Sequence, residues 1–341
     1  MEEVISISHA TDIDGVGSSS LIRMKYGIPQ DRVFFTDYNV ESIRMVEKGI
    51  KRLLTNKTTV FLIDLGVNER TGPAFLRMLR NVKRKGGKVL WFDHHPWTGK
   101  SVRELESICD TAIYGENRRY CGAEITRREL GLRDGFTERL CRLVHYSDFN
   151  IRPRKANDYR IIGTYALSIA YYHTLGHERS MRGLRHITSV ISNGRLLDGR
   201  IRSDAGRFRR LNDGQVARML RDVYLGRNIA LGFAGHIQKT YACMKLIEKT
   251  GRDIGVYVNL IDHRGHMRSV RSDCSQLAVR FGGGGHPHAS GFSPDFRKYN
   301  NFRSRLDRER LLEDLVKTAD RINLKPARGH QGSSSKEALF N

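Results

Sequence analysis

Residues 88–95 of the chain read Lys88-Val89-Leu90-Trp91-Phe92-Asp93-His94-His95. The first five form a short apolar run between two glycines and an acidic residue, which is typical of a buried β-strand. Three further runs of this kind lie upstream, at residues 4–8, 32–36 and 59–63. Segments with helical spacing separate the runs. Short apolar strands that alternate with helices predict an α/β fold, with a parallel sheet covered by helices on both faces.

Three of the four runs are followed by side chains that can bind a metal ion. These side chains are His9, Asp12 and Asp14 after the first run, Asp64 after the third, and Asp93, His94 and His95 after the fourth. The carboxyl ends of parallel strands meet at one edge of a sheet, and ligands of open α/β folds bind there. We therefore expect these side chains to converge.

Carboxylates and imidazoles are ligands of Mn²⁺, Mg²⁺ and other divalent ions. An aspartate that bridges two ions holds them roughly 3.5–4 Å apart, which suits in-line attack of a shared hydroxide on phosphorus. Asp148, which follows a predicted helix at 137–146, adds a further carboxylate. Each element alone has a simpler interpretation, because an aspartate at a strand end is often a helix cap. Their order and common placement favour a metal site.

The charge of the chain is unevenly distributed. The 341 residues carry a formal net charge of +22, of which residues 1–150 contribute only +4 and residues 151–341 contribute +18. Arginine dominates the second part, and its planar guanidinium suits bidentate recognition of phosphate. The basic part therefore favours a polyanionic partner, most simply nucleic acid. A generally basic proteome or an association with ribosomes would give the same excess.

Composition disfavours several other classes of protein. No apolar run reaches the roughly 18 residues that span a bilayer. The acidic N-terminus is unlike a signal peptide, so we expect a cytoplasmic protein without membrane contact. The five cysteines are widely spaced and include no Cys-x-x-Cys pair, which argues against a zinc ribbon or a disulfide scaffold.

The length suggests two domains. Helical spacing continues over residues 137–190, and a region rich in arginine and glycine follows, with a helix expected near 215–224. A second α/β unit is predicted from strands at 229–234, 254–261 and 266–272 and helices at 237–249, 275–281 and 303–322. The predicted division is a first domain at 1–182, a connector at 183–228, a smaller α/β domain at 229–325 and a disordered tail at 326–341.

Four glycines at residues 282–285 precede His286 in the second unit. They could form a flexible turn. Alternatively, glycines let backbone N–H groups approach a phosphate closely. The two interpretations differ in whether this segment binds a ligand.

Together these motifs resemble the DHH family of phosphoesterases, with its C-terminal DHHA1 domain. The N-terminal motifs are Ser8-His9-Ala10-Thr11-Asp12-Ile13-Asp14-Gly15, Leu62-Ile63-Asp64, Asp93-His94-His95 and Asp148. The C-terminal motifs are Arg268-Ser269-Val270-Arg271-Ser272 and Gly282-Gly283-Gly284-Gly285-His286-Pro287-His288-Ala289-Ser290-Gly291-Phe292. The family includes RecJ-like nucleases, nanoRNases, cyclic-dinucleotide and phosphoadenosine-phosphate hydrolases, and family II pyrophosphatases.

The resemblance implies a site for two Mn²⁺ ions, with Mg²⁺ or Co²⁺ as alternatives. One ion would be held by His9 and Asp12, the other by Asp14, His94 and Asp148, and Asp64 would bridge them. Asp93 would orient a ligand histidine, and His95 would contact the substrate phosphate as an electrostatic stabiliser or proton donor. The substrate would also be bound by Arg271, Ser272, Gly284, Gly285 and His286. Trp97 could offer a base-stacking platform, whereas Trp91 is expected in the core.

We therefore expect a Mn²⁺-dependent phosphodiesterase that hydrolyses short single-stranded RNA or DNA, or acts as an exonuclease, by attack of a metal-bridging hydroxide. Alternative substrates are small nucleotides and phosphates: cyclic dinucleotides, phosphoadenosine phosphate, pyrophosphate or polyphosphate. A non-catalytic nucleic-acid-binding replication factor would have lost ligands, and none is lost here. The sequence leaves open RNA versus DNA, the polarity of degradation, the substrate length and whether the chain forms a homodimer.

Overall fold

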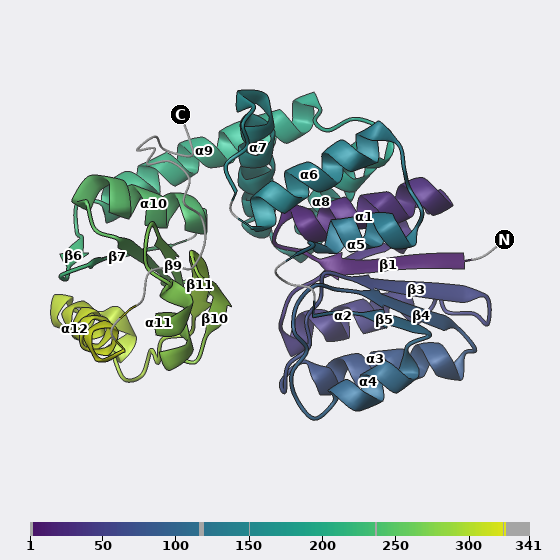
Figure 1. The fold of residues 1–341 in the computed structure, drawn as a ribbon, viewed down its shortest axis with the longest axis horizontal. Coiled ribbons are helices and arrows are strands. Elements are labelled where there is room, and N and C mark those ends of the chain that lie inside the picture. The colour runs from purple at the N-terminus through teal and green to yellow at the C-terminus, as the bar shows by residue number, and fades with distance from the viewer. Residues whose placement is uncertain (1–2, 116–118, 150, 236, 323, 325–341) are drawn as a thin grey trace. The chain divides into compact units, whose positions relative to one another are not determined.

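The computed structural model describes residues 3–115, 119–149, 151–235, 237–322 and 324. The chain divides into two compact units, Met1–Ala205 and Gly206–Asn341, and Figure 1 labels the elements of each. The predicted disordered tail at 326–341 lies outside the described residues. The finer division into a catalytic domain, a connector and a substrate-binding domain stays a prediction.

The first unit is built on a five-stranded sheet of order β2-β1-β3-β4-β5, in which all neighbouring strands are parallel. Its strands are β1 (Glu3–His9), β2 (Val33–Thr36), β3 (Thr58–Ile63), β4 (Lys88–Phe92) and β5 (Thr111–Ile113). The four strands predicted from apolar runs are all present, and the predicted parallel sheet is confirmed. The sequence analysis missed β5, because its three residues are only partly buried and form no apolar run.

Helices cover both faces of this sheet (Figure 1). The helices of the first unit are α1 (Ile13–Tyr26), α2 (Val40–Ile50), α3 (Gly72–Arg84), α4 (Val102–Ile108), α5 (Gly122–Glu129), α6 (Gly135–Asp148), α7 (Ala156–His173) and α8 (His177–Ser192); a 3₁₀ turn (Gln30–Arg32) precedes β2. Side chains that alternate along β3 enter separate cores: Phe61 packs among α1, α5 and α6, whereas Leu62 packs among α2 and α3. Both faces of the central strands are therefore buried, which explains why they read as continuous apolar runs.

The second unit contains a six-stranded mixed sheet of order β10-β11-β9-β8-β7-β6. Its strands are β6 (Tyr224–Leu225), β7 (Ile229–Ala234), β8 (Ile254–Asn259), β9 (Arg264–Ser269), β10 (Gly284–His286) and β11 (Ala289–Phe292), and its helices are α10 (Lys239–Thr250), α11 (Cys274–Arg280) and α12 (Arg305–Arg321), with a 3₁₀ turn at Asn300–Phe302. Only β7 and β8 pair in parallel. The predicted second, smaller α/β domain is confirmed.

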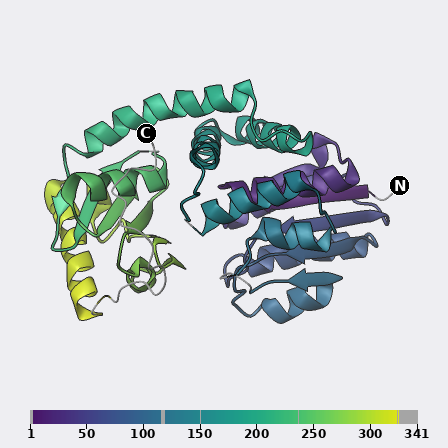
Figure 2. The same ribbon diagram turned by 45° about the horizontal axis from the view of Figure 1, so that its top comes forward.

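Helix α9 (Gly199–Met219) differs from its prediction. A helix was predicted only near 215–224 within an irregular region, but α9 begins at Gly199, and Figure 2 draws it as one continuous helix. The buried residues Ile201, Ala205 and Phe208 form a stripe with helical spacing. This pattern was not recognised in the sequence because glycines and arginines surround it. Each interior glycine costs about 1 kcal/mol relative to alanine, and the packing of this stripe offsets that cost. Among the described residues, no helix is both long and apolar enough to span a membrane.

Candidate metal centre

The parallel register brings the ends of three strands together. Ser8 of β1 pairs with Ile63 of β3, and Ile63 pairs with Phe92 of β4. His9 is the last residue of β1, and Asp64 and Asp93 directly follow β3 and β4, so the three residues lie side by side at the carboxyl edge of the sheet.

The start of helix α1 supplies two more carboxylates. Asp12 is the N-cap of this helix, and its Oδ1 accepts hydrogen bonds from the backbone N–H groups of Asp14 (3.1 Å) and Gly15 (3.3 Å). The helix begins close against the strand end, since a Cβ at Gly15 would lie 2.0 Å from the carbonyl oxygen of His9. Asp12 is thus a helix cap through one oxygen, while Oδ2 lies 3.0 Å from His9 Nδ1.

Two groups of side chains could each hold a metal ion. His9, Asp12 and Asp64 form the first group, and their ligand atoms lie within 4.8 Å of one another. Asp64 Oδ2 lies 3.5 Å from His9 Nδ1. His9 ends β1, Asp64 directly follows β3, and Asp12 caps α1, so the sheet and the start of this helix set their spacing.

The second group consists of Asp14, His94 and Asp148. His94 Nε2 lies 3.9 Å from Asp14 Oδ2, 3.7 Å from Asp148 Oδ2 and 3.4 Å from Asp64 Oδ1. Asp64 therefore directs one oxygen toward each group. This is the geometry expected of a carboxylate that bridges two ions.

Asp64 adopts an unusual backbone conformation, with a φ of 56°. Aspartate tolerates this left-handed region better than most residues, and strain of this kind concentrates at functional sites. The backbone N–H of Asp64 donates to the carbonyl of Phe92 at 3.0 Å. The chain thus turns sharply where β3 ends, and its buried carboxylate lies between the two groups.

The donor set fits divalent cations. Within the described part of the chain, Asp64 Oδ2, Asp148 Oδ2 and both ring nitrogens of His94 are buried without a hydrogen-bond partner. Buried polar atoms are nearly always paired, so atoms left without a partner require an explanation such as an ion. Carboxylate and imidazole ligands suit Mn²⁺ and similar ions. The structure thus supports a divalent-metal site at this edge of the sheet.

The pKa directions agree with an excess of negative charge. Burial and the charges of Asp64 and Asp148 raise the pKa of Asp14 well above its ordinary value. Burial likewise raises the pKa of Asp148 to about 6, although the neighbouring His94 opposes this. Burial disfavours protonation of His94, but Asp64 and Asp148 raise its pKa to about 9. The cluster therefore favours added positive charge, which a divalent cation would supply.

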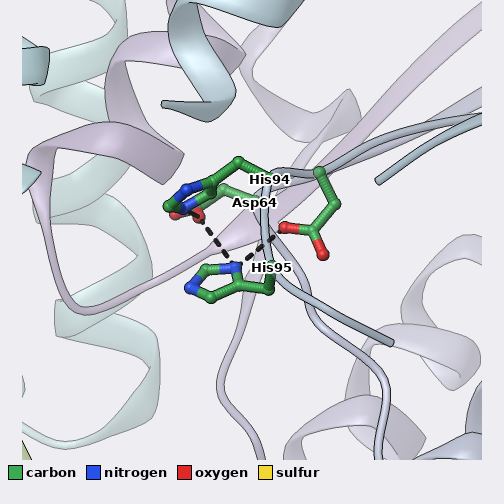
Figure 3. Close-up of side chains that lie close together, drawn as sticks. Asp64, His94 and His95 are labelled. Carbon is green, nitrogen blue, oxygen red and sulfur yellow. Dashed lines mark hydrogen bonds and ion pairs between the residues drawn. The ribbon is translucent and has the colours of Figure 1, made fainter. Parts of the chain in front are cut away.

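Asp93 contacts His95. Its Oδ1 lies 2.9 Å from His95 Nδ1, and its Oδ2 accepts a hydrogen bond from Trp97 Nε1 at 2.8 Å. Asp93 was predicted to orient a ligand histidine, but its histidine partner in the structure is His95, which was assigned to the substrate. His95 Nδ1 also lies 3.7 Å from Asp64 Oδ1 (Figure 3). Asp64, Asp93, His94 and His95 could form a third metal-binding group, but both oxygens of Asp93 already have partners.

The expectation that Trp97 offers a base-stacking platform is wrong. Its side chain is only 8% exposed. The indole ring stacks on Tyr114 with centroids 4.3 Å apart and meets Trp91 edge-on at 4.5 Å. Trp97 therefore holds Asp93 in place from within the core, and Trp91 is buried as predicted.

Three residues of the site were missed in the sequence. Asp37 Oδ1 lies 3.8 Å from His9 Nε2, and the Tyr38 ring packs on the His9 ring with centroids 4.8 Å apart. Both follow β2, so the rule that polar residues gather at strand ends would have identified them. Gly122 could not have been found this way, because its contribution is a backbone N–H group.

Gly122 and Ala123 begin helix α5, and their N–H groups each donate to the Asp14 carboxylate at 2.7 Å. A helix N-terminus favours a negative charge, so α5 fixes the orientation of this carboxylate. A Cβ at Gly122 would lie 3.1 Å from Asp64 Cβ and 3.2 Å from Asp14 Oδ2. A side chain at this position would therefore press against both carboxylate residues.

We expect Gly122→Ala to weaken Mn²⁺ binding by about tenfold, as changes to the partners of metal ligands commonly do. The added methyl group would displace Asp14 or Asp64. Isothermal titration calorimetry with Mn²⁺ measures the effect. Gly135→Ala is the matched control, because Gly135 occupies the same first position of α6 and a Cβ there has no neighbour within 4 Å. Equal affinities of the two variants would contradict the proposed role of Gly122.

The second unit brings the other predicted substrate contacts together. The buried carboxylate of Asp253 accepts hydrogen bonds from the backbone N–H groups of Arg271 (2.8 Å) and Ser272 (3.0 Å) and from the Ser272 hydroxyl. Ser269 Oγ donates to the carbonyl of Pro287 at 3.3 Å and so ties this turn to the glycine segment. The Arg271 side chain is 79% exposed, whereas the Ser272 hydroxyl serves the fold.

The glycine segment forms an edge strand. Gly284 and His286 bound β10, which pairs with β11. Gly285 has a φ of 136°, and a Cβ there would lie 2.6 Å from the carbonyl oxygen of Ala289, so its backbone requires glycine. At Gly284, by contrast, a Cβ would meet no described atom within 4 Å and φ is not positive.

Comparisons with known proteins identify the fold. No protein-family model and no curated protein matches the chain. Among solved structures, an exopolyphosphatase-related protein from Bacteroides fragilis matches 94% of this chain and 93% of its own, at 14% identity and a TM-score of 0.51. A pGpG-specific phosphodiesterase from Vibrio cholerae matches 93% and 99%, at 13% identity and a TM-score of 0.51.

RecJ from Thermus thermophilus, solved in complex with Mn²⁺, matches 96% of this chain at 15% identity and a TM-score of 0.54. The match covers only 53% of the RecJ chain. Each of the three likenesses extends over 93–96% of this chain and so includes residues of both units. The chain has the fold of the DHH superfamily of phosphoesterases.

Proposed function

We propose that this protein is a divalent-metal-dependent phosphodiesterase that hydrolyses short single-stranded oligonucleotides. The observation that carries the proposal is the position of Asp64, whose two oxygens face two separate ligand groups. A site of this kind is suited to hydrolysis at phosphorus. Two Mn²⁺ ions are the preferred occupants, with Mg²⁺ or Co²⁺ as alternatives.

The ligand groups assign the roles of the residues. His9 and Asp12 would hold one ion, Asp14, His94 and Asp148 the other, and Asp64 both. When bound, two such ions lower the pKa of a shared water and offset the charge of the phosphate.

His95 lies beside the ligands without belonging to either group. Asp93 fixes its ring through Nδ1, and Trp97 in turn donates to Asp93, which leaves His95 Nε2 to donate to a substrate phosphate. The chain thereby places a hydrogen-bond donor next to the reacting group.

The second unit supplies features suited to a nucleotide chain. The second unit, residues 206–341, carries 25 lysines and arginines against 13 acidic residues, a net charge of +12, which favours a polyanion. The exposed Arg271, the open backbone at Gly284 and the adjacent His286 are candidate contacts to a phosphate or ribose. Nothing in the described structure requires glycine at 284, so close approach of a ligand would explain it.

A dinucleotide is the second candidate substrate. The pGpG-specific phosphodiesterase matches nearly all of both chains, whereas the match to RecJ covers about half of RecJ. Because this similar structure of comparable length is specific for a dinucleotide, the likeness supports a substrate of very few nucleotides for this chain.

A substrate panel with Mn²⁺ tests the proposal. It compares linear dinucleotides, RNA and DNA oligomers labelled at either end, cyclic dinucleotides, phosphoadenosine phosphate, pyrophosphate and polyphosphate. Faster hydrolysis of the linear oligonucleotides supports the proposal, and the end label gives the polarity. Faster hydrolysis of pyrophosphate or polyphosphate would overturn the substrate class. Binding of oligonucleotides without any cleavage would instead indicate a non-catalytic nucleic-acid-binding protein.

Metal binding alone gives a further prediction. We expect a Mn²⁺ concentration of 100 times Kd to stabilise the fold by about 2.7 kcal/mol, which corresponds to a rise in Tm of roughly 5–10 °C for the first unit. The reason is that the cation relieves repulsion among the buried carboxylates. Differential scanning calorimetry with Mn²⁺ and then with EDTA measures the shift and its reversal. An unchanged Tm would contradict the metal site.

A further inference from the structure

A cavity lined by several arginines lies away from the metal centre. It is a cavity of about 650 Å³ in the first unit, between the start of α6, the start of α7 and the segment that joins α8 to α9. Asp148 lies at the opposite end of α6. Nine residues separate it from Arg139 in the cavity wall, which is about 14 Å along the helix axis.

Four arginines line the cavity: Arg139, Arg160, Arg195 and Arg202. No lining residue carries a carboxylate. Arg139 is held by an ion pair of 2.8 Å with the buried Asp158, so one guanidinium is fixed and its charge compensated. In the described part of the chain, neither Arg160 nor Arg202 forms an ion pair. The cavity therefore presents uncompensated positive charge to an anion.

Apolar side chains form part of the remaining wall, beside Asn157. Phe136, Ile161, Leu196 and Leu197 line it, and all four pack against the core of the first unit. Thr164 adds a hydroxyl on the same face of α7 as Ile161, three residues away along the helix. Arginines beside an apolar surface suit a ligand that joins a phosphate to a flat, weakly polar ring. The volume lies within the range of small-molecule sites, roughly 300–1,000 Å³.

The wall between α8 and α9 is preformed. The hydroxyl of the fully buried Tyr165 donates to the carbonyl of Leu196. Gly194 closes α8 in the left-handed region, with a φ of 74°. Asp198 caps α9 by accepting from the backbone N–H of Ile201 at 2.8 Å, and its other oxygen lies 2.8 Å from His186 Nε2. A ligand would thus meet a wall that is already ordered, which lowers the entropic cost of binding.

We propose that this cavity binds a nucleoside phosphate, with the phosphates on Arg160, Arg195 and Arg202 and the base against the apolar wall. The nucleotide is either free or the end of an oligonucleotide, since both present the same chemistry. The proposal does not depend on hydrolysis at the metal centre.

Calorimetry in EDTA, which limits binding at the metal centre, tests the proposal with the full chain. The probes are ADP, a 5′-phosphorylated RNA hexamer and pyrophosphate. We expect the double variant Arg160→Gln/Arg202→Gln to weaken ADP binding by about tenfold or more, because each charged hydrogen bond contributes more than 1 kcal/mol. Arg52→Gln/Arg103→Gln, which removes the same charge from exposed positions outside the cavity, should bind ADP as the unmodified protein does.

The outcomes separate the sources of the ligand. If the cavity variant loses affinity for ADP alone, the ligand is a free nucleotide. If it loses affinity for the hexamer in parallel, the ligand is the end of an oligonucleotide. Three results would overturn the proposal: no ADP binding by the unmodified protein, equal ADP affinity in the cavity variant, or pyrophosphate binding as tight as that of ADP. The last would show that the apolar wall is not used. Circular dichroism verifies that each variant is folded.

Discussion

Replacement of Asp64 by asparagine is expected to reduce hydrolysis by about 1,000-fold or more. The amide cannot carry the charge that two cations would share, and among the described ligand side chains it is Asp64 that directs oxygens toward both groups. Without this carboxylate the two groups would lose their common ligand, and bound ions would no longer share an activated water. The measurement is kcat/KM with Mn²⁺ on the best substrate of the panel, together with metal content by mass spectrometry.

Asp31→Asn is the matched control, because Asp31 is exposed and lies outside the site. It should retain full activity and both metal ions. Circular dichroism of Asp64→Asn in EDTA verifies its fold. Normal turnover by a folded Asp64→Asn protein would show that the two-metal assignment is wrong.

Replacement of His95 by glutamine is expected to lower kcat by about 100- to 1,000-fold while both metal ions remain bound. The imidazole is held by Asp93 and belongs to neither ligand group, so its loss removes a contact to the substrate rather than a ligand. Side chains that donate protons in a transition state typically contribute 10²- to 10⁴-fold. The readouts are single-turnover kinetics and metal content.

Two further variants sharpen this prediction. Asp93→Asn should reduce kcat by a smaller factor, about 10- to 100-fold, because it acts only by orienting His95. His177→Gln, at an exposed position, should have no effect. A His95→Gln protein that loses one metal ion would show instead that the third group, with Asp93 and His95 as ligands, is the one that binds.

Most of the first sheet could be predicted from the sequence because its central strands are buried on both faces. Burial makes them continuous apolar runs, and the parallel arrangement places their ends at one edge. This is why His9, Asp64 and His94 could be grouped before the structure was known. The short strand β5 left no such run, and α9 was obscured by glycines that its buried stripe tolerates.

The parts of the site that were missed depend on tertiary contacts. Gly122 acts through a backbone N–H group that donates to a side chain 108 residues away, and no local pattern records such a contact. Trp97 was misassigned for a related reason: an aromatic residue next to a polar motif looks the same in sequence whether it is exposed or buried. Asp37 and Tyr38 directly follow the predicted strand at 32–36. They could have been predicted by the rule used for the other strands, that polar residues at strand ends gather at one edge of the sheet.

The spread of the ligands along the chain also determines when the site can form. Its residues extend from His9 to Asp148, and the parallel pairing of β1 with β3 and of β3 with β4 must be complete before they meet. Contacts this distant in sequence form late and slowly in folding. A cation that binds only the finished arrangement should therefore leave the refolding rate nearly unchanged and slow unfolding instead. Stopped-flow measurements of the refolding and unfolding rates, with and without Mn²⁺, test this expectation. Bound metal would then set the lifetime of the native state.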